Sequence, residues 1–539
     1  MSFEIRDRDL LARIGKLETK SGIIETPLLF PVINPSIQPI SPSALQELFR
    51  CTSVITNAYI IKMHFQDTAV QQGIHSLLGF SKAIMTDSGA YQILTYGDVK
   101  TTAREIVEYQ EAINTDIATI LDIPTGWMVS EDHARWTVQE TLRRAKDLVD
   151  TKKRDDILWV GPVQGGSYTD LVVQSAQKMG KLPFEIHAIG SPTPVLEQYR
   201  FDTLVDMILA AKANLPLDRP LHLFGAGHPF MFALAVALGC DLFDSAAYAI
   251  YARSNRYMTE QGTKRLDELR YFPCSCPTCV RSNPQDIMVL PMAAREKALA
   301  MHNLYVSFSE ISRIKQAIIE GRLWEHLELR ARGHPALLKA LKSLKKHRLF
   351  FEKNSPVTKT SGLFSLSSLG LTRPEVTRHR KRISERYSPP KEGKILLLLP
   401  QTTRKPFHKS KAHQKILKQL HHKLGSEIDK THVCTYAAPF GVVPAEIDQV
   451  YHLSQHETVT PLSIESIDYV AEQVAEYIST TEYEMVILFQ DVETWKMKIT
   501  EACKKACRER RIHMETYTQE KGELWALGRL ADYTENHNK

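Results

Sequence analysis

The stretch that decides the fold is AIMTDSG, residues 83 to 89, in which an apolar run ends abruptly at Asp87, Ser88 and Gly89. The apolar residues predict a buried strand, and the Ser-Gly pair predicts a tight turn after it. A carboxylate at the mouth of a buried strand is costly to desolvate. Taken alone, such an aspartate is more often a solvated loop residue than a functional one, so the rest of the chain decides its meaning.

Seven further apolar runs resemble this one, and amphipathic helices are predicted between several of them, as at 133–150 and 201–215. Eight strands that alternate with helices over about 250 residues are typical of a (β/α)8 TIM barrel, an α/β fold. An open doubly wound sheet gives the same alternation, but its glycine-rich nucleotide fingerprint is missing. A hairpin with the turn KSG is predicted over 11–27. The other runs are TPLLFPVI (26–33), CTSVITNAY (51–59), DIATILDIP (116–124), ILWVGPVQGG (157–166), EIHAIGS (185–191), PLHLFGAG (220–227) and LFDSAAYA (242–249).

The composition is that of a soluble globular protein with real cores: 539 residues, 43% hydrophobic and 24% charged. This length allows two to four domains. The first eleven residues lack the apolar core of a signal peptide, and the apolar stretch 230–240 is too short to span a bilayer. With eight cysteines, three of them crowded together, a disulfide framework is not the natural interpretation. We therefore expect a soluble cytoplasmic protein without a membrane partner.

The charge is unevenly spread along the chain. The net charge is only +6, yet residues 330–392 carry 16 Lys and Arg against 4 Asp and Glu. A basic segment of this kind suits a polyanion such as nucleic acid. A solvated, helix-rich linker explains the charge equally well.

Polar residues stand at the ends of the predicted strands, and in a TIM barrel the carboxyl ends of the strands carry the active site. Two carboxylates that face one pocket permit chemistry at a glycosidic bond, one attacking or stabilising the anomeric carbon and the other handling a proton. A further carboxylate, an amide and backbone groups can grip a heterocycle by its hydrogen-bonding edge. The pattern predicts a barrel enzyme that handles a sugar or a base. The candidates are Asp87, Asp122, Gln164, Gly190, Ser191 and Asp244.

The motif PCSCPTC supplies Cys274, Cys276 and Cys279, and His302 follows in the predicted helix AMHNLY. Three thiolates and one imidazole complete a tetrahedral zinc shell with no open position, which indicates a structural metal. Free core cysteines are the alternative, and the crowding disfavours it. His326 and His334 are alternatives to His302 as the fourth ligand.

The chain resembles the archaeal tRNA-guanine transglycosylases over roughly its first 350 residues. The resemblance implies a (β/α)8 barrel with an inserted zinc subdomain at about 270–305. The motifs that carry it occur in the family's order and are MTDSGAYQ (85–92), TILDIPTG (119–126), VQGG (163–166), HAIGS (187–191), HLFGAGHPFMFALAVALGCDLFDSAAYAIYARSNRYMT (222–259), CSCPTC (274–279) and HNLYVSF (302–308).

The resemblance also implies roles for the candidates. Asp244 matches the covalent nucleophile and Asp87 the general acid/base, although the sequence alone leaves open which of the two is the nucleophile. Asp122 matches the residue that recognises the incoming base, with Gln164 and the Gly190-Ser191 backbone alongside. The zinc ligands match Cys274, Cys276, Cys279 and His302.

The reaction implied is an exchange of guanine-15 in the tRNA D-arm for preQ0 (7-cyano-7-deazaguanine) or a derivative. It proceeds through a covalent ribosyl-aspartate intermediate and belongs to archaeosine biosynthesis. One N-glycosidic bond replaces another, so no ATP or redox cofactor is required, and the only metal is one structural zinc per chain. The family tends to dimerise, which predicts a dimer or a hetero-oligomer.

We predict a catalytic domain at 1–350, a basic linker at 351–392 and a smaller α/β C-terminal domain at 393–539 that begins at KILLLLPQ. The last domain resembles the accessory domain of archaeal transglycosylases and that of archaeosine synthase, whose signature is Pro-Cys-x3-Lys-Pro-Tyr-x2-Ser-x2-His. The stretch PQTTRKPFHKSKAH (400–413) keeps Lys405, Pro406, Ser410 and His413 but has Gln401 for the cysteine and Phe407 for the tyrosine. This predicts a structural descendant of that domain.

Full-length archaeal members end in a PUA domain, and no such segment is recognised here. We therefore expect a separate PUA-domain subunit as a partner. Three other interpretations stay open: a non-catalytic tRNA-binding subunit, an archaeosine synthase paralogue, and a glycoside hydrolase. The paired aspartates disfavour the first, Gln401 the second, and the zinc quartet the third.

Overall fold

The structure is a computed structural model, and it describes residues 3–90, 101–424 and 430–518. The last two residues of the MTDSGAYQ motif lie outside the described residues. The chain divides into two compact units, 1–344 and 345–539, which we describe separately. Among the described residues, no helix combines the length and the apolar character that crossing a bilayer requires.

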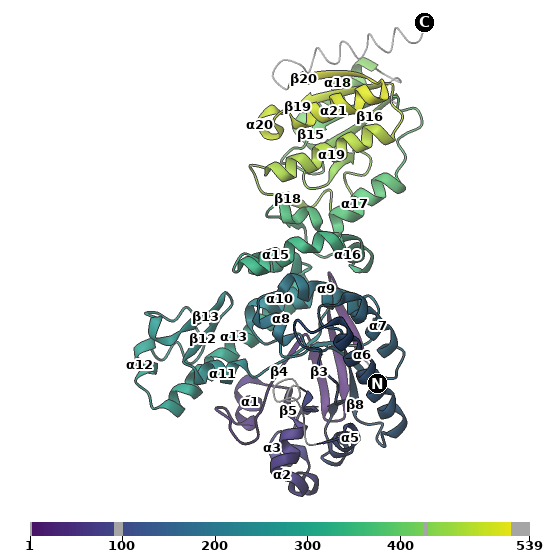
Figure 1. The fold of residues 1–539 in the computed structure, drawn as a ribbon. Coiled ribbons are helices and arrows are strands. Elements are labelled where there is room, and N and C mark those ends of the chain that lie inside the picture. Colours follow the sequence, from purple (N-terminus) through teal and green to yellow (C-terminus); the bar gives the residue numbers. More distant parts are fainter. Residues whose placement is uncertain (1–2, 91–100, 425–429, 519–539) are drawn as a thin grey trace. The chain divides into compact units, whose positions relative to one another are not determined.

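The first unit is built on an eight-stranded parallel barrel (Figure 1). Its strands follow one another around the barrel in chain order, and a parallel bridge between Val32 and Ile55 joins the last pair and closes it. Each strand lies inside one of the eight predicted apolar runs, so the predicted fold class is confirmed. The strands are β4 (Leu28–Pro31), β5 (Ser53–Asn57), β6 (Ala83–Asp87), β7 (Ile117–Thr119), β8 (Leu158–Val163), β9 (Ile186–Ile189), β10 (Leu221–Leu223) and β11 (Leu242–Ser245).

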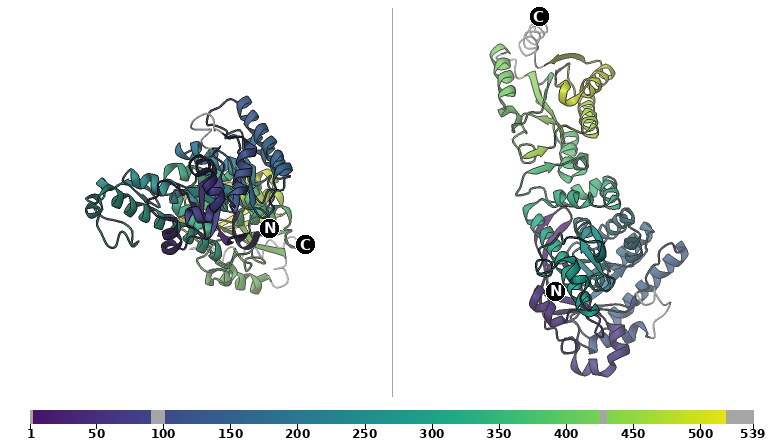
Figure 2. Two further views of the ribbon diagram at one scale, coloured as in Figure 1. Left: turned by 90° about the horizontal axis from the view of Figure 1, so that it is seen from below. Right: turned by 90° about the vertical axis from the view of Figure 1, so that its left-hand side faces the viewer.

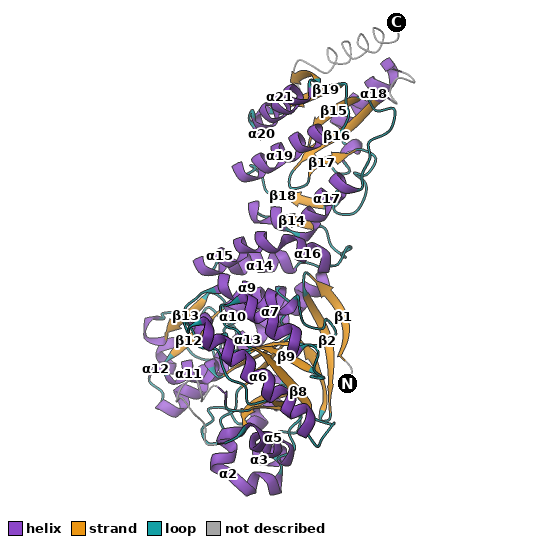
Figure 3. Cartoon of the chain, turned by 45° about the vertical axis from the view of Figure 1, so that its right-hand side comes forward, coloured by secondary structure: helices purple, strands orange, loops and turns teal. Residues whose placement is uncertain are grey.

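Helices cover the outside of the strands (Figure 3). Strands buried on both faces read as continuous apolar runs, and β8 is buried at every position. The helix α6 (Glu131–Thr151) starts at Ser130, whose side chain accepts a hydrogen bond from the His133 amide, and both predicted helices are present. Further helices are α1 (Pro42–Phe49), α2 (Ala58–Gln72), α3 (Ile74–Leu78), α5 (Ala103–Ala112), α7 (Thr169–Met179), α8 (Thr193–Glu197), α9 (Phe201–Lys212), α10 (Pro229–Ala237), α11 (Ala247–Arg253), α14 (Leu323–Ala331) and α15 (Pro335–Ser343).

A three-stranded antiparallel sheet packs on the amino end of the barrel. It consists of β1 (Phe3–Asp9), β2 (Ala12–Thr19) and β3 (Gly22–Thr26), of which β2 and β3 form the predicted hairpin. Leu17 and Ile24 of this hairpin are buried in one cluster with Ala83, Ile117 and other barrel residues. The amino end is therefore closed by apolar packing, and access to the barrel is left at the carboxyl end.

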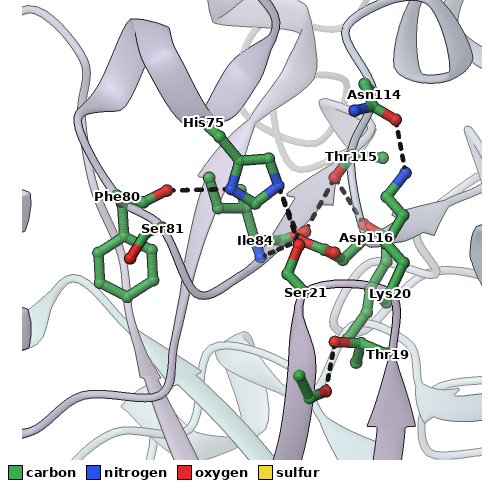
Figure 4. A network of polar contacts seen from close by, with 12 residues as sticks. Thr19, Lys20, Ser21, His75, Phe80, Ser81, Ile84, Asn114, Thr115 and Asp116 are labelled. Atoms are coloured by element: carbon green, nitrogen blue, oxygen red, sulfur yellow. Dashed lines mark hydrogen bonds and ion pairs between the residues drawn. The ribbon is translucent and has the colours of Figure 1, made fainter.

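Two buried carboxylates at the amino end, Asp116 and Asp241, have hydrogen-bond and ion-pair partners. Asp116, just before β7, accepts a hydrogen bond from the Ile84 amide (2.7 Å), and the Nε2 atom of His75 lies 3.1 Å from its Oδ2 (Figure 4). Nearby, Arg13 forms a bidentate ion pair with Asp241 at 2.8 Å, and both side chains are buried.

A small subdomain follows the barrel and projects from it to one side (Figures 1 and 2). It contains the hairpin β12 (Arg256–Thr259) and β13 (Gly262–Arg265), the short helix α12 (Pro284–Met288) and the long helix α13 (Met292–Glu320). Asn303 of α13 accepts a hydrogen bond from the Met258 amide (2.9 Å) and donates to the Tyr248 carbonyl (3.1 Å). These contacts join β12 to α13 within the subdomain and fix α13 to α11.

The second unit is a smaller α/β fold around a five-stranded sheet of order β17-β16-β15-β19-β20. β16 was not predicted as a strand, and the range predicted as a basic linker is folded, with Arg373 and Arg378 buried. The strands are β14 (Leu363–Ser365), β15 (Ile395–Pro400), β16 (Thr431–Ala437), β17 (Gly441–Pro444), β18 (His456–Thr458), β19 (Met485–Gln490) and β20 (His513–Thr518). Its helices include α16 (Arg348–Asn354), α17 (Pro374–Glu385), α18 (Lys411–Leu424), α19 (Ile464–Thr480), α20 (Val492–Trp495) and α21 (Lys498–Arg510).

Candidate active site and metal centre

The barrel brings the predicted site residues to the same end. Asp87 is the last residue of β6, Asp122 follows β7, Gln164 follows β8, Gly190 follows β9 and Asp244 lies near the end of β11. Because all eight strands are parallel, these positions share the carboxyl end of the barrel. Convergence therefore follows from the topology.

Asp87 is a half-buried carboxyl group with few donors. Its pKa is raised to about 7, first by desolvation and then by the nearby carboxylates of Asp122 and Asp244, against the lowering effect of the Gly89 and Ser88 amides. Its only side-chain donor among the described residues is Asn57, whose Nδ2 lies 3.1 Å from Oδ2. Both other aspartates therefore lie close enough to Asp87 to raise its pKa.

Asp122 and Gln164 form a buried pair. Burial raises the pKa of Asp122 to about 6, and the hydrogen bond from the Gln164 Nε2 opposes this rise. The orientation of the Gln164 amide is fixed, because its Oε1 accepts from the Thr125 amide (2.9 Å) and from the Ser191 hydroxyl (3.2 Å). The pair presents a carboxylate whose second oxygen accepts no hydrogen bond from the described residues.

Gly190 leaves room for this arrangement. A Cβ atom on Gly190 would lie 2.2 Å from the Gln164 Nε2, so a side chain there would displace the amide from Asp122. The Gly190 amide donates to the Val163 carbonyl (2.9 Å), which ties the turn after β9 to the end of β8. The glycine thus keeps Gln164 beside Asp122.

Asp244 is held from one side. Its Oδ1 accepts from the Gly225 amide (2.9 Å) and lies 3.0 Å from the Nε2 of His222. His222 is fully buried, and its Nδ1 has no hydrogen-bond partner among the described residues. A proton on Nδ1 would be a buried unsatisfied donor, so the neutral Nε2–H form is favoured. Both hydrogen bonds end on Oδ1, which leaves Oδ2 for a substrate.

Sequence reasoning missed three side chains at this end. His222 lies within β10, Asn57 caps α2, and the buried Ser88 hydroxyl has no hydrogen-bond partner among the described residues. Each lies inside a quoted apolar run, where a single polar residue carries no periodic signal. Only the register of the barrel shows that Asn57 contacts Asp87 and that His222 contacts Asp244.

The combined arrangement suits acid–base chemistry at a bond between a sugar and a base. A carboxyl group with a pKa near 7 can donate and accept a proton at neutral pH. A second carboxylate, oriented through one oxygen, can attack or stabilise an electron-poor carbon. The Asp122–Gln164 pair offers a hydrogen-bonding edge beside them.

The four predicted metal ligands come together in the subdomain. The ligand atoms of Cys274, Cys276, Cys279 and His302 all lie within 4.8 Å of one another. The Nδ1 of His302 is 3.5 Å from the Cys276 sulfur and 3.4 Å from the Cys279 sulfur. A tetrahedral site with ordinary zinc bond lengths places sulfur and nitrogen about 3.5 Å apart. The cluster can therefore hold a metal ion without rearrangement.

The histidine of this cluster is oriented by its surroundings. The Nε2 of His302 donates to the Met258 carbonyl (2.9 Å), which leaves Nδ1 as the ligand atom. The Tyr257 ring stacks on the imidazole with centroids 3.6 Å apart, and its hydroxyl lies 3.3 Å from the Cys279 sulfur. His326, an alternative fourth ligand, is instead 2.8 Å from Glu310, so His302 is the histidine that the cluster contains.

Comparisons with known proteins agree with this geometry. The family model described as queuine tRNA-ribosyltransferase matches residues 8–336, and one described as a domain of unknown function matches 376–531. The tRNA-guanine(15) transglycosylase of Methanocaldococcus jannaschii is 44% identical over 467 residues, which cover 85% of this chain and 68% of that protein. The enzyme of the same name from Thermococcus kodakarensis is 47% identical, with 70% and 65% covered, and that of Pyrobaculum aerophilum 43%, with 85% and 90% covered.

Proposed function

The chain belongs to the queuine tRNA-ribosyltransferase family, and from this membership we propose that it exchanges the guanine at position 15 of a tRNA for another base. The observation that carries the proposal is the set of three aspartates at the carboxyl end of the barrel, one of which has a pKa of about 7. The activity is that of a pentosyltransferase. We propose a 7-deazaguanine such as preQ0 as the incoming base, on the archaeosine pathway.

The proposed reaction has two displacements. In the first, Oδ2 of Asp244 attacks the anomeric carbon of the ribose, and the bond to N9 of guanine breaks as Asp87 gives its proton to the departing base. In the second, N9 of the incoming base attacks the same carbon, its proton passes to Asp87, and the ester to Asp244 breaks. Each step consumes one bond and forms one, so no cofactor is required.

The Asp122–Gln164 pair supports exchange rather than hydrolysis. Guanine and a 7-deazaguanine present the same edge of ring N–H and exocyclic amine, and a carboxylate that accepts from both can hold either base. Gln164 fixes the Asp122 carboxylate through one oxygen and leaves the other for this edge. The site can thus release guanine and accept its replacement in the same orientation.

The test is base exchange followed by trapping of the intermediate. Wild type, Asp244→Asn and Asp87→Asn are incubated with unmodified tRNA and labelled guanine, and acid-quenched samples are run on a denaturing gel. We expect incorporation and a protein–tRNA adduct for wild type, and no adduct for Asp244→Asn. An adduct that forms with Asp244→Asn but not with Asp87→Asn would reverse the two roles. No exchange by wild type would reject the function for the isolated chain.

We further propose that the Cys3His cluster holds one structural zinc ion. Its donor set and closed geometry are those of structural zinc sites, and His302 is already oriented for ligation. Metal analysis should give one zinc per chain for wild type and none for Cys276→Ala. A different metal, or no metal, in freshly purified protein would reject the assignment.

We propose no synthase chemistry for the second unit. Gln401, which stands where the synthase signature has cysteine, accepts a hydrogen bond from the Ala438 amide (2.9 Å) and so joins the ends of β15 and β16. This structural use supports the proposed descent without the activity. The PUA-domain subunit and the dimer or hetero-oligomer stay predictions, which copurification from the native cell and sedimentation would test.

A further inference from the structure

Two loops at the carboxyl end of the barrel are hydrogen-bonded to the same side-chain amide, that of Gln164. The loop after β7 reaches Gln164 through the Thr125 amide, and the turn after β9 reaches it through the Ser191 hydroxyl. Thr125 is further fixed by its hydroxyl, which accepts from the Gly165 amide (3.1 Å) and lies 2.7 Å from the Thr137 hydroxyl. The two loops therefore begin beside the pair that we propose to hold the base.

The same loops meet again farther along the chain. The guanidinium of Arg200 lies over the ring of Trp127, 5.9 Å from its centroid, within the range of a cation–π contact. Beside this pair, Met128 is 87% exposed and Tyr199 is 51% exposed. We call these four residues the aromatic rim.

The rim is held in place, although Met128, Tyr199 and Arg200 are exposed and Trp127 is half-buried. The Tyr168 hydroxyl donates to the Val129 carbonyl (2.8 Å), directly after Met128. The Tyr199 ring stacks on His334 with centroids 4.9 Å apart, which supports one of its faces. Met128 and Tyr199 also have positive φ angles of 57° and 54°, an unfavourable backbone conformation for large side chains. These large side chains are exposed on a strained backbone, so burial of apolar surface does not explain their positions.

We infer that the aromatic rim binds unstacked nucleotides of the RNA substrate that flank the target base. The inference rests on the proposed function, because a base drawn into the barrel must leave its stack and expose the faces of its neighbours. Indole and phenol rings stack on any base, and a base–aromatic contact contributes about 1–3 kcal/mol. The rim lies on the two loops that are bonded to Gln164 of the base-holding pair, and those neighbours have to pass these loops.

The charge of the rim favours stacking over phosphate binding. Glu197, three residues before Arg200, is exposed, so its negative charge offsets the positive charge of Arg200. Neutralised phosphates make binding steeply salt-dependent, whereas stacking does not. Loss of a rim ring should therefore weaken tRNA binding without changing the slope of log K against log salt.

The test compares Trp127→Ala with Trp136→Ala in the full-length protein. Trp136 lies on α6, is 50% exposed and contacts His133, and so is a matched exposed tryptophan outside the rim. We expect Trp127→Ala to raise the KM for tRNA about 10-fold, with the KM for free guanine and the salt slope unchanged. Trp136→Ala should change neither KM. Thermal unfolding confirms that both variants fold.

A second readout is independent of catalysis. Stacking of a base on Trp127 should quench its fluorescence when tRNA is added, and Trp127→Phe should lose that part of the quenching while keeping tRNA affinity within about 3-fold. An unchanged KM for tRNA with Trp127→Ala would overturn the inference. So would a change of oligomeric state in sedimentation, since the rim would then be a protein interface. Quenching without exchange by wild type would reject the proposed function and keep the rim.

Discussion

Two buried aspartates flank strand β7, and the barrel treats them in opposite ways. At the amino end, burial alone would raise the pKa of Asp116, but hydrogen bonds from His75, Ser21 and the Ile84 amide outweigh it and lower the pKa. At the carboxyl end, burial raises the pKa of Asp122 to about 6, although the hydrogen bond from Gln164, its own backbone amide and the charge of Arg144 all act to lower it. Along the chain, only the short strand β7 separates these two aspartates.

A similar contrast holds between two other strands of the barrel. Asp241 before β11 has a bidentate ion pair with Arg13, whereas no described residue forms an ion pair with Asp87 at the end of β6. Asp87 thus lacks the kind of partner that Asp241 has at the amino end. Carboxylates left without partners have perturbed pKa values, which is what acid–base chemistry at neutral pH requires. The difference separates residues that stabilise the barrel from residues that we propose to act on substrate.

The largest expected effect is on activity at the carboxyl end. Asp87→Asn should lower kcat for base exchange by about 10²- to 10⁴-fold, because the proton donor is lost. Stability should not fall. The folded-state pKa of about 7 lies above the usual aspartate value of 3.8, so the stability that the protonated Asp87 contributes is present at low pH and lost as the pH rises through 7. The asparagine of Asp87→Asn does not ionise, so this variant does not lose that stability as the pH rises. Exchange kinetics and urea unfolding at pH 8 measure both effects; a kcat within 10-fold of wild type would contradict the role.

The largest expected effect on stability is at the amino end. Arg13→Met leaves the buried Asp241 carboxylate without its ion-pair partner and should lower the free energy of unfolding by about 3–5 kcal/mol. The double variant with Asp241→Asn should recover part of this loss, since no uncompensated charge remains. Urea unfolding measures the loss, and exchange per folded molecule should stay at the wild-type level. A double variant less stable than Arg13→Met would show that the pair is not the cause.

Much of the fold was predictable from the sequence. Strands covered on both faces leave continuous apolar runs, and all eight runs contain a strand of the barrel. The strand β16 was missed because THVCTYA mixes polar and apolar residues, although its side chains are largely buried in the structure. The folded structure within 351–392 was also not predictable from the sequence. Its many charged residues are typical of a solvent-exposed segment, yet Arg373 and Glu375 are buried.

The candidate site was predictable only to the level of strand ends. Asp116 and Asp122 stand at the two ends of one quoted run, DIATILDIP, and the polarity of the barrel marks the second as the candidate. The hydrogen-bond partners of Asp116 come from positions 21, 75 and 84, which are far from it in the sequence. No local sequence pattern therefore predicts that its pKa is lowered. His222 was missed for the same reason, since its contact with Asp244 depends on the register between β10 and β11.

A smaller effect separates the two aspartates of β7 directly. Asp116→Asn replaces an acceptor that serves the Ile84 amide and His75, and should lower the free energy of unfolding by about 1–3 kcal/mol with exchange unchanged. Asp122→Asn should leave stability equal or higher and raise the KM for guanine at least 10-fold, because an amide has one acceptor oxygen and cannot accept from both Gln164 and the base. If the two variants changed the same quantity in the same direction, the contrast between the two ends would be wrong.

The smallest effect is a pH dependence confined to the amino end. Both ring nitrogens of His75 face acceptors, since Nδ1 lies 3.0 Å from the Phe80 carbonyl and Nε2 3.1 Å from Asp116, and only the doubly protonated ring satisfies both (Figure 4). The hydrogen bond to Asp116 accordingly raises the pKa of His75. With a folded-state pKa above the unfolded one, the stability is present below about pH 6.5 and is lost as the pH rises through the folded-state value. We expect a fall of about 1 kcal/mol in the free energy of unfolding, measured in urea. His75→Asn should remove the His75 share of this slope, because an amide does not titrate, while the share that Asp87 contributes and the kcat profile set by Asp87 stay unchanged. A slope as steep in His75→Asn as in wild type would assign the whole dependence to other groups, and a shift of the kcat profile would show that the two ends of the barrel are coupled.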